Sequence, residues 1–356
     1  MKLKTILTIL FLLLLSGGGG TVYAQEKFEW NVDFKTIFDN REGDSRMTAT
    51  RTFLQTQLAP SAGVSFGAGT HTLMAGVVWT QPVGTEWREG KLAPTLYYAY
   101  RRHGLRGALG MFPRSMLIRP VPNYVWSDSS YYTQANVRGG AISYESGRGY
   151  IEGIMDWRGI QSDSRREAFN IILRGEYGGR DRFLSGGLLL MMNHLALTRN
   201  SGPDEHIVDN FLYNPYLAVD FSRRLPLDSL SLRAGVLGVV TRHRAEPDWR
   251  SPIGAWVEID LRWRWLWAKN TFYGGSPLFP YYSDFGALLD QGEPYFRSSW
   301  YERLSLAASL VRNERVDLRV GLDFNLAKNN FTFYQRILLA VTFGSRQHKA
   351  SRLIPF

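Results

Sequence analysis

The chain has 356 residues, and its 42 lysines and arginines outnumber its 32 aspartates and glutamates, which gives a formal net charge of +10. It contains no cysteine, and this excludes a disulfide framework, thiolate metal ligands and a lipid anchor on an N-terminal cysteine. Aromatic residues make up 14% of the chain, a high share for a sequence whose mean hydropathy of −0.21 is that of a water-soluble protein.

The N-terminus has the three parts of a secretory signal. Lys2 and Lys4 precede an apolar run over residues 5–15, and a small-residue cleavage site ends at Ala24. The run is shorter than the roughly 20 residues that a spanning helix needs. We therefore expect residues 1–24 to be a signal peptide. Loss of its two lysines lowers the net charge from +10 to +8, and export argues against nucleic acid as a partner.

Apolar and polar residues alternate in recurring segments of the mature chain, which is the period of a β-strand with one apolar face. The phase of the ninth segment is unclear because it is apolar throughout, and the thirteenth is weakly patterned. The pattern predicts an all-β chain of about 16 strands, with roughly 14 as the lower bound. The expected strands lie near 26–38, 54–66, 73–79, 92–100, 105–111, 131–144, 151–157, 169–177, 183–192, 211–221, 230–240, 253–263, 270–273, 300–310, 316–326 and 331–343.

The hairpin over residues 316–343 shows the alternation most clearly. Leu318 and Leu322 lie on one face of its first strand, and Asp317, Arg319 and Asp323 lie on the other. In a soluble sandwich the apolar face would be the core. In a membrane barrel the apolar face meets lipid and the charged face lines a lumen. One hairpin is compatible with both architectures.

The connections between the strands favour the membrane barrel. Long connections alternate with tight turns along almost the whole chain, as in barrels with long outer loops and short periplasmic turns. Trp30, Trp79 and Trp263 lie near strand ends, where aromatic side chains would sit at the lipid headgroups. We expect a single transmembrane antiparallel β-barrel over residues 25–343, a periplasmic tail over 344–356, and both termini in the periplasm because the strand number is even.

With this architecture the chain resembles the porin-like outer-membrane β-barrel proteins of Gram-negative bacteria. The resemblance covers the whole mature chain but rests on no subfamily motif. Chain-terminal Phe356 is similar to the aromatic end that the barrel-assembly machinery reads in that group, although a basic tail separates it from the last strand. The resemblance implies a location in the bacterial outer membrane, with outer-membrane lipid and lipopolysaccharide as neighbours.

If the apolar faces meet lipid, the opposite faces line the lumen with charge, because a lipid-facing arginine or lysine would cost about 2–4 kcal/mol at the bilayer midplane. The charges could select solutes across a water-filled pore, or they could cross-link into a plug. Sixteen strands generally leave an aqueous channel, which favours a pore. The candidate lumen-lining residues are Glu152, Asp156, Arg174, Glu176, Glu258, Asp260, Arg262, Arg264, Arg303, Asp317, Arg319, Asp323 and Arg336.

Two long connections carry further candidate residues. The connection over 113–130 is rich in proline, and it would constrict the pore if it folds inward or cap the barrel if it stays outside. Its candidates are Arg114, Arg119, Tyr124 and Trp126. The connection over 274–297 is aromatic enough to bind sugars or a partner protein, or to pack against a neighbouring loop. Its candidates are Phe279, Tyr281, Tyr282, Phe285, Tyr295 and Phe296.

Three hypotheses follow. The first is a channel for passive passage of small hydrophilic solutes. The excess of arginine in the predicted lumen favours anionic solutes. The alternative is a non-conducting subunit of a larger outer-membrane complex, docking onto other outer-membrane proteins through its aromatic loops. The third is a hydrolase at the barrel rim built on Asp204, His206 and Asp209, with Asp163 and Asp248 in other outer loops and the histidine as general base. We do not expect an enzyme, because such residues are ordinary on exposed loops. No ligand spacing predicts a metal or a cofactor.

Overall fold

The computed structural model describes residues 26–43, 47–179, 183–222, 224–345 and 349–353. The expected signal peptide and Phe356 lie outside this part of the chain. The strands are β1 Lys27–Glu42, β2 Arg51–Phe66, β3 His71–Pro82, β4 Lys91–Arg102, β5 Leu105–Pro113, β6 Asn136–Ser146, β7 Gly149–Gly159, β8 Ala168–Gly178, β9 Leu184–Leu195, β10 Val208–Asp220, β11 Ser229–His243, β12 Ile253–Trp263, β13 Leu266–Gly275, β14 Trp300–Arg312, β15 Val316–Ala327 and β16 Asn330–Gly344.

Short helical segments lie in the connections between strands and, in one case, after β16. They are η1 Trp87–Glu89, η2 Arg114–Met116, α2 Asp128–Thr133, α3 Tyr282–Phe285, η3 Gly286–Leu288, η4 Pro294–Arg297 and η5 Ala350–Arg352. Among the described residues, no helix is both long enough and apolar enough to span a bilayer.

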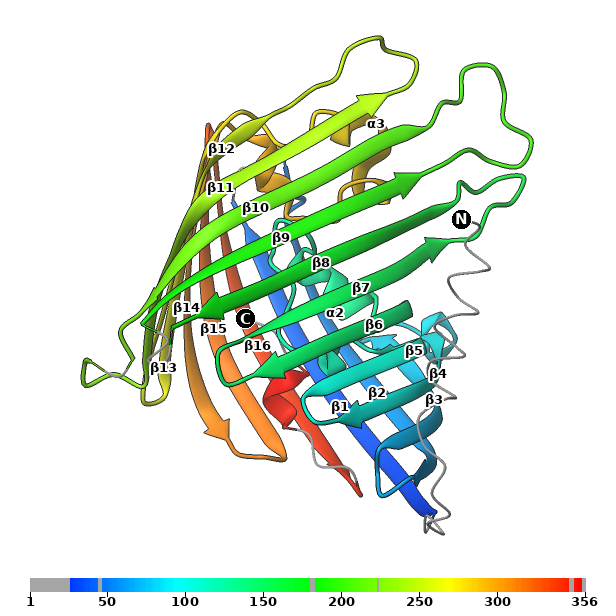
Figure 1. Ribbon diagram of the computed structural model, residues 1–356, viewed down its shortest axis with the longest axis vertical. Helices are drawn as coiled ribbons and strands as arrows, with labels where there is room; N and C mark the ends of the chain where they lie inside the picture. The colour runs from blue at the N-terminus through cyan, green and yellow to red at the C-terminus, as the bar shows by residue number, and fades with distance from the viewer. Residues whose placement is uncertain (1–25, 44–46, 180–182, 223, 346–348, 354–356) are drawn as a thin grey trace.

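Each strand pairs antiparallel with its neighbours in sequence, and β1 also pairs with β16, so the sheet closes into a barrel of 16 strands (Figure 1). At the seam Ile37 lies opposite Leu338 and Asn31 lies opposite Gly344. The predicted all-β antiparallel barrel is therefore confirmed.

The two ends of the barrel differ in the length of their connections. The end with tight turns, such as those at residues 67–70 and 103–104, is called the short-turn end below, and the opposite end is called the long-loop end. Lys27 at the start of β1 lies opposite Ser65 next to the turn at 67–70, and Gly344 ends β16 beside Asn31. The chain therefore enters and leaves the barrel at the short-turn end.

The apolar face of each strand lies on the outside of the barrel. On the final hairpin, Leu322 and Ile337 are 39% and 47% exposed, whereas the lumenal Asp317, Asp323 and Arg336 are at most 2% exposed. A water-soluble fold would bury the leucine and leave the carboxylates wet. The arrangement is that of a barrel whose outer wall faces hydrocarbon.

Some strand boundaries differ from the sequence-based expectation. β1 continues to Glu42, four residues past the expected end, and β13 occupies Leu266–Gly275, so residues expected to form a turn belong to a strand. The strand expected from residue 131 begins only at Asn136, because Asp128–Thr133 form α2. Tyr131 and Tyr132 of that helix are buried in an apolar cluster inside the barrel, and this packing overrides their preference for a strand.

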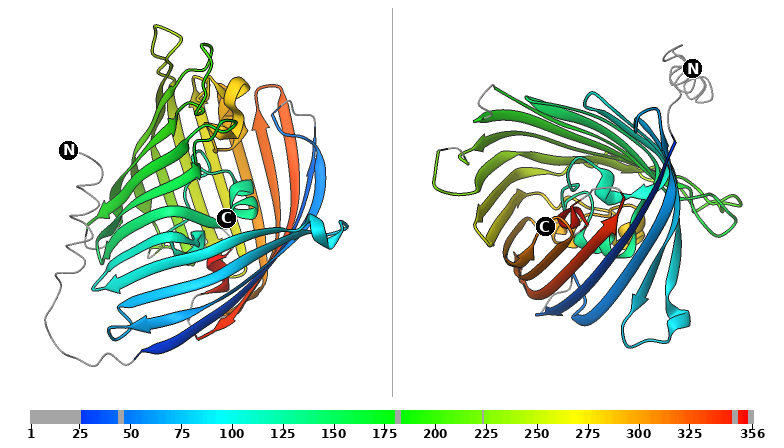
Figure 2. Two further views of the ribbon diagram at one scale, coloured as in Figure 1. Left: turned by 90° about the vertical axis from the view of Figure 1, so that its right-hand side faces the viewer. Right: turned by 90° about the horizontal axis from the view of Figure 1, so that it is seen from below.

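Two connections fold into the lumen. The first inward segment, residues 114–135 between β5 and β6, carries α2. The second inward segment, residues 276–299 between β13 and β14, carries α3. Seen along the barrel, both lie inside the ring of strands (Figure 2). Their buried side chains, among them Tyr124, Trp126 and Phe296, form the centre of the protein.

Part of the lumenal wall is apolar where these segments pack. The side chains concerned come from β9, β10 and β11 and belong to the same cluster as the inward segments; they are Leu189, Met191, Leu212, Leu237 and Val239. This explains the unclear phase of the ninth strand, because both of its faces are apolar.

Candidate channel lumen

The first inward segment is fixed to β7 at its N-terminal end. Arg114 forms an ion pair with Asp156 at 3.1 Å, and its guanidinium carbon lies 3.8 Å from the centre of the Trp126 ring. The backbone N–H of Ile118 donates to Glu152 Oε1 at 2.8 Å. Both acceptors are lumenal carboxylates, so the wall holds the segment through charge-assisted hydrogen bonds, the stronger class of hydrogen bond.

Arg174 on β8 holds the middle of the same segment. Its Nε donates to Glu152 Oε2 at 2.9 Å, and its Nη1 donates to the Pro120 carbonyl at 2.7 Å. A further bond from Nη2 reaches the Arg119 carbonyl. The Arg119 and Pro120 carbonyls have no strand partner, and the Arg174 guanidinium donates a hydrogen bond to each of them. Buried backbone oxygens need such partners.

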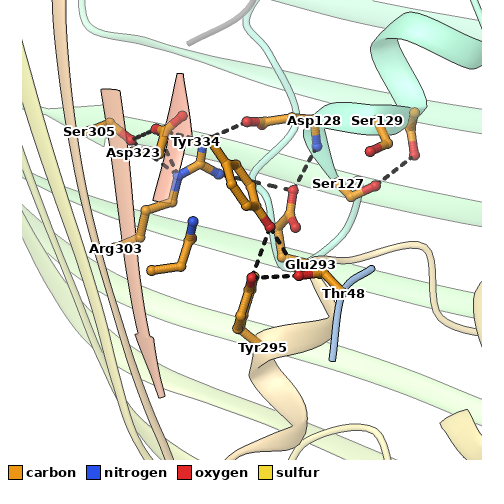
Figure 3. A network of polar contacts seen from close by, with 12 residues as sticks. Thr48, Ser127, Asp128, Ser129, Glu293, Tyr295, Arg303, Ser305, Asp323 and Tyr334 are labelled. Atoms are coloured by element: carbon orange, nitrogen blue, oxygen red, sulfur yellow. Dashed lines mark hydrogen bonds and ion pairs between the residues drawn. The ribbon is translucent and has the colours of Figure 1, made fainter. Parts of the chain in front are cut away.

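Asp128 at the start of α2 anchors the segment to the opposite wall (Figure 3). Its Oδ2 lies 2.5 Å from Arg303 Nη2 on β14 and 2.8 Å from Arg336 Nη1 on β16. Both guanidiniums also pair with Asp323 on β15. Burial alone would raise the pKa of Asp128, but the two arginines hold it well below its ordinary value. Asp128, Asp323 and the two guanidiniums thus form the centre of a buried network, which also takes in Glu293 at 4.0 Å from Arg303.

The two inward segments are bonded to each other. The Asp128 N–H donates to Glu293 Oε1 at 2.9 Å, and the Glu293 N–H donates to the Asn123 carbonyl at 2.8 Å. The Tyr124 and Phe296 rings meet edge to face with centroids 6.1 Å apart. Because polar and apolar contacts join them, the segments form a single body inside the barrel.

The aromatic residues of the second inward segment are turned away from solvent. Tyr295 Oη lies 2.8 Å from both Thr48 Oγ1 and Tyr334 Oη (Figure 3), and Tyr281 Oη donates to Glu246 Oε2 at 2.8 Å. Phe279, Tyr281, Tyr295 and Phe296 are buried, and Tyr282 and Phe285 are half-buried and pack against buried clusters. The side chains that the sequence suggested for sugar stacking or partner docking thus pack within the protein.

The structure brings most of the predicted lumenal charges together in ion-pair groups. Apart from the network around Asp128, Arg114 pairs with Asp156, Arg174 with Glu152, and Arg319 with Asp317. Asp260 accepts a hydrogen bond from the Trp267 indole at 3.2 Å. Arg262 lies on the lumenal face of β12, near Asp260.

Arg264 is placed elsewhere. It lies in the exposed turn between β12 and β13 with a φ of 54°, and its guanidinium carbon is 5.4 Å from the centre of the Trp263 ring. The prediction for Arg264 was wrong because it continued the alternation of β12 by one residue. The strand ends at Trp263, and the turn that follows directs the Arg264 side chain away from the lumen.

Another ion-pair group, called the third group below, consists of Glu176, Glu258, Arg233 and Lys269. The strand pattern had not singled out its two basic residues. Arg233 on β11 lies 3.1 Å from Glu258 and 3.6 Å from Glu176, and Lys269 on β13 lies 2.7 Å from Glu258. Arg233 sits between the outward Leu232 and Ala234, so the phase of that strand was sufficient to find it. Lys269 was missed because its part of β13 was expected to be a turn.

This third group borders a cavity of about 220 Å³ in the short-turn half of the lumen. Its wall combines charged groups with the aromatic side chains Tyr150, Tyr216 and Trp256, and Arg119 of the first inward segment closes one side. The Tyr216 hydroxyl donates to Glu176 Oε2 at 3.0 Å. The cavity is large enough to hold a small molecule, and its wall offers that molecule both charged groups and aromatic faces.

The residues considered for a rim hydrolase do not form a catalytic arrangement in the described part of the chain. Asp209 pairs with Arg244 at 2.8 Å, and Asp163 pairs with Arg199 at 3.6 Å. The His206 ring packs against the His243 ring, with centroids 5.5 Å apart. Among the residues that the structure describes, no three His, Cys, Asp or Glu side chains gather to hold a metal ion.

A closed barrel with an apolar outer wall, a lumen lined with charge and connections folded inward has the architecture of bacterial outer-membrane porins. Neither a protein-family model nor a curated protein matches the sequence. Solved structures do match. The outer membrane protein OprD of Pseudomonas aeruginosa is 11% identical, with a TM-score of 0.53, over 91% of this chain and 96% of that chain.

Two further structures of proteins from the same organism give similar values. OccK2 (OpdF) is 11% identical with a TM-score of 0.53, covering 90% of this chain and 98% of its own. OccK3 (OpdO) is 10% identical with a TM-score of 0.51, covering 90% and 96%. At this level of identity the likeness establishes the fold. It confirms the resemblance to porin-like outer-membrane barrels that the sequence indicated.

Proposed function

We propose that the protein is an outer-membrane channel for small hydrophilic solutes, with a preference for anions. The observation that carries the proposal is the cavity beside Arg119, which is the size of a small solute and lies in the lumen of a 16-stranded barrel. Barrels of this size are wide enough for an aqueous path, and here the inward segments narrow it. In the proposed orientation the short-turn end faces the periplasm, with both chain ends on that side.

The preference for anions rests on Arg119. Its guanidinium carbon lies 5.0 Å from the centre of the Tyr150 ring, and no carboxylate among the described residues forms an ion pair with it. The other basic side chains of the cavity wall, such as Arg233 and Lys269, are paired. An arginine held by an aromatic face keeps its N–H donors available to a carboxylate or phosphate oxygen. OccK2, which shares the fold, has been crystallised in complex with glucuronate, a sugar acid.

The docking alternative has less support. The aromatic residues of the second inward segment, Phe296 among them, are buried inside the barrel, where a partner protein would not reach them. The outer wall, by contrast, exposes large apolar side chains such as Leu109 and Leu217, at 60% and 64%. We therefore propose outer-membrane lipid and lipopolysaccharide as the neighbours of the barrel and small solutes as its ligands.

Planar-bilayer recording tests the proposal. The purified mature protein should produce discrete single-channel steps, and a salt gradient should give a reversal potential of the sign expected for anion preference. Arg119→Ala should move that potential toward zero selectivity. The matched control is Arg88→Ala, because Arg88 lies on an exposed loop and pairs only with exposed Glu86 among the described residues. A folded protein that never conducts would contradict the channel, and an unchanged potential in Arg119→Ala would contradict the role of Arg119.

A further inference from the structure

The barrel is complete before the chain ends. β16 finishes at Gly344, and Ser345 then binds back to β1: its N–H donates to the Trp30 carbonyl at 2.9 Å, and its hydroxyl donates to Glu29 Oε2 at 2.8 Å. No described residue after Ser345 takes part in strand pairing. Closure of the ring therefore leaves the described part of the tail available for another purpose.

The described part of this C-terminal tail, residues 349–353, lies inside the barrel at the short-turn end. The helical turn η5 lies inside the ring of strands when the barrel is viewed along its length (Figure 2). The Ala350 N–H donates to the carbonyl of Glu314, in the turn between β14 and β15, at 3.0 Å. Ala350 is fully buried and Leu353 is 8% exposed.

The wall that receives the tail is apolar although it faces the lumen. Three lumenal side chains of this wall are apolar and at most 1% exposed, although charged lumenal residues lie beside them on the same strands. They are Ile37 on β1 and Leu338 and Ala340 on β16. They belong to the same apolar cluster as Ala350 and Leu353. A lumen open to water at this place would leave these side chains wet, and burial of apolar surface favours a tail that covers them.

The tail also reaches the first inward segment. Leu353 borders a cavity of about 60 Å³ together with Lys35, Gln57, Val78 and Tyr131. Lys35 Nζ donates to the Tyr131 carbonyl at 3.4 Å, so the wall of this cavity is tied to α2. The remaining space is enough for a few water molecules, at about 10–15 Å³ each, and is too small for a solute.

We propose that the C-terminal tail is an internal stopper, which closes the path between the first inward segment and the wall of β1 to β4. The proposal rests on the channel function proposed above. The tail competes with solute for the same part of the lumen, so withdrawal of residues 349–353 opens a second path beside the cavity at Arg119. Since residues 349–353 lie at the short-turn end, where Ala350 binds the turn between β14 and β15, the stopper is controlled from that side of the membrane.

Two variants test the stopper independently of each other. The first ends the chain after Ser345, and the second is Leu353→Asp, which places a carboxylate in the apolar site and expels the tail. Lys349→Asp is the matched control, because it introduces the same carboxylate at an exposed position of the same tail. Each protein is refolded in detergent, its folding is checked by β-sheet circular dichroism and heat-dependent migration, and its single-channel conductance is measured.

The truncated chain and Leu353→Asp should conduct at least twofold more than the wild-type protein, and Lys349→Asp should match the wild type. If the truncated chain does not refold, the comparison of the two point variants decides. Equal conductance in folded wild-type, truncated and Leu353→Asp proteins would overturn the stopper and leave the channel standing. Absence of conductance in all of them would overturn the channel itself, and the stopper with it.

Discussion

Asp128 on the first inward segment accepts a hydrogen bond from the Arg336 guanidinium on β16 at 2.8 Å, although 208 positions of sequence separate the two residues. The same carboxylate oxygen lies 2.5 Å from Arg303 on β14. A single aspartate thus joins the inward segment to the last strands of the barrel. Removal of one partner from such a buried network leaves charge without compensation, and this is costly.

Asp128→Asn should therefore destabilise the protein by roughly 3–5 kcal/mol, the range for breaking a buried ion pair. Arg336 would then pair with Asp323 alone, and Arg303 would keep Asp323 and the more distant Glu293. Denaturant unfolding in detergent, followed by tryptophan fluorescence, measures the change. Glu86→Gln breaks the exposed pair with Arg88 and serves as the control, with an expected loss of about 1 kcal/mol or less. Equal losses in the two variants would show that the network does not anchor the segment.

Asp290 on the second inward segment should make the seating of that segment depend on pH. Burial raises the pKa of Asp290 from an ordinary 3.8 to about 7, opposed by Arg158 and by a hydrogen bond from Asn210. The folded state therefore favours the neutral acid. The stabilisation is fully present below pH 3.8 and is lost as pH rises through about 7.

The free energy of unfolding of the wild-type protein should be lower at pH 8 than at pH 5. This difference should be smaller in Asp290→Asn, because the amide does not titrate. At about 1.4 kcal/mol per unit of pKa, the contribution to be lost is roughly 2–4 kcal/mol. Asp284→Asn, on the same segment but exposed, is the control. A pH dependence that is the same in the wild-type protein and both variants would mean that Asp290 does not govern the seating.

Position along a strand should decide the effect of a charge on the outer wall. Leu322 lies in the middle of β15 and Leu326 lies near its long-loop end, and both side chains point outward. Leu322→Arg should cost about 2–4 kcal/mol in lipid vesicles, and Leu326→Arg about 0–1 kcal/mol, because the second arginine can reach the headgroups. Equal costs would argue that this face of β15 does not cross hydrocarbon.

Gly235 on β11 is required by the close approach of the neighbouring strand. A Cβ at this position would lie 2.2 Å from the Pro215 carbonyl oxygen and 2.7 Å from Tyr216 Cα, which are backbone atoms that cannot rotate away. Gly235→Ala should destabilise the barrel by roughly 1–3 kcal/mol, as overpacking does. Gly202→Ala, in an exposed loop with no heavy atom within 4 Å of the added Cβ, should leave the unfolding midpoint unchanged.

The sequence predicted the barrel well because alternation is a property of each strand by itself. Leu322 and Asp323 on β15 show the two faces directly, and the structure places them outside and inside as expected. Alternation did not reveal the phase of a strand where its lumenal face packs against the inward segments instead of facing water. Leu189 and Met191 face inward on β9 against the inward segments, so both faces of that strand are apolar and its phase was hidden.

The contacts that the inward segments make with the barrel wall could not be predicted from local sequence patterns. Nothing near Asp128 in the sequence indicates that Arg303 and Arg336 will surround it, since such contacts depend on closure of the whole ring. The burial of Leu353 is of the same kind, because a tail after the last strand carries no periodicity that reveals where it lies. Arg264 shows the smaller error of extending a strand by one residue into a turn.

The pairing of β1 with β16 has a consequence for biogenesis. The residues opposite one another at this seam, such as Phe34 and Val341, are made first and last during synthesis. Until the final strand arrives, the N-terminal one presents a row of unsatisfied N–H and C=O groups, which is the feature that drives proteins to aggregate edge to edge. The free edge of β1 therefore needs protection until synthesis is finished, because the ring can close only after its last strand is present.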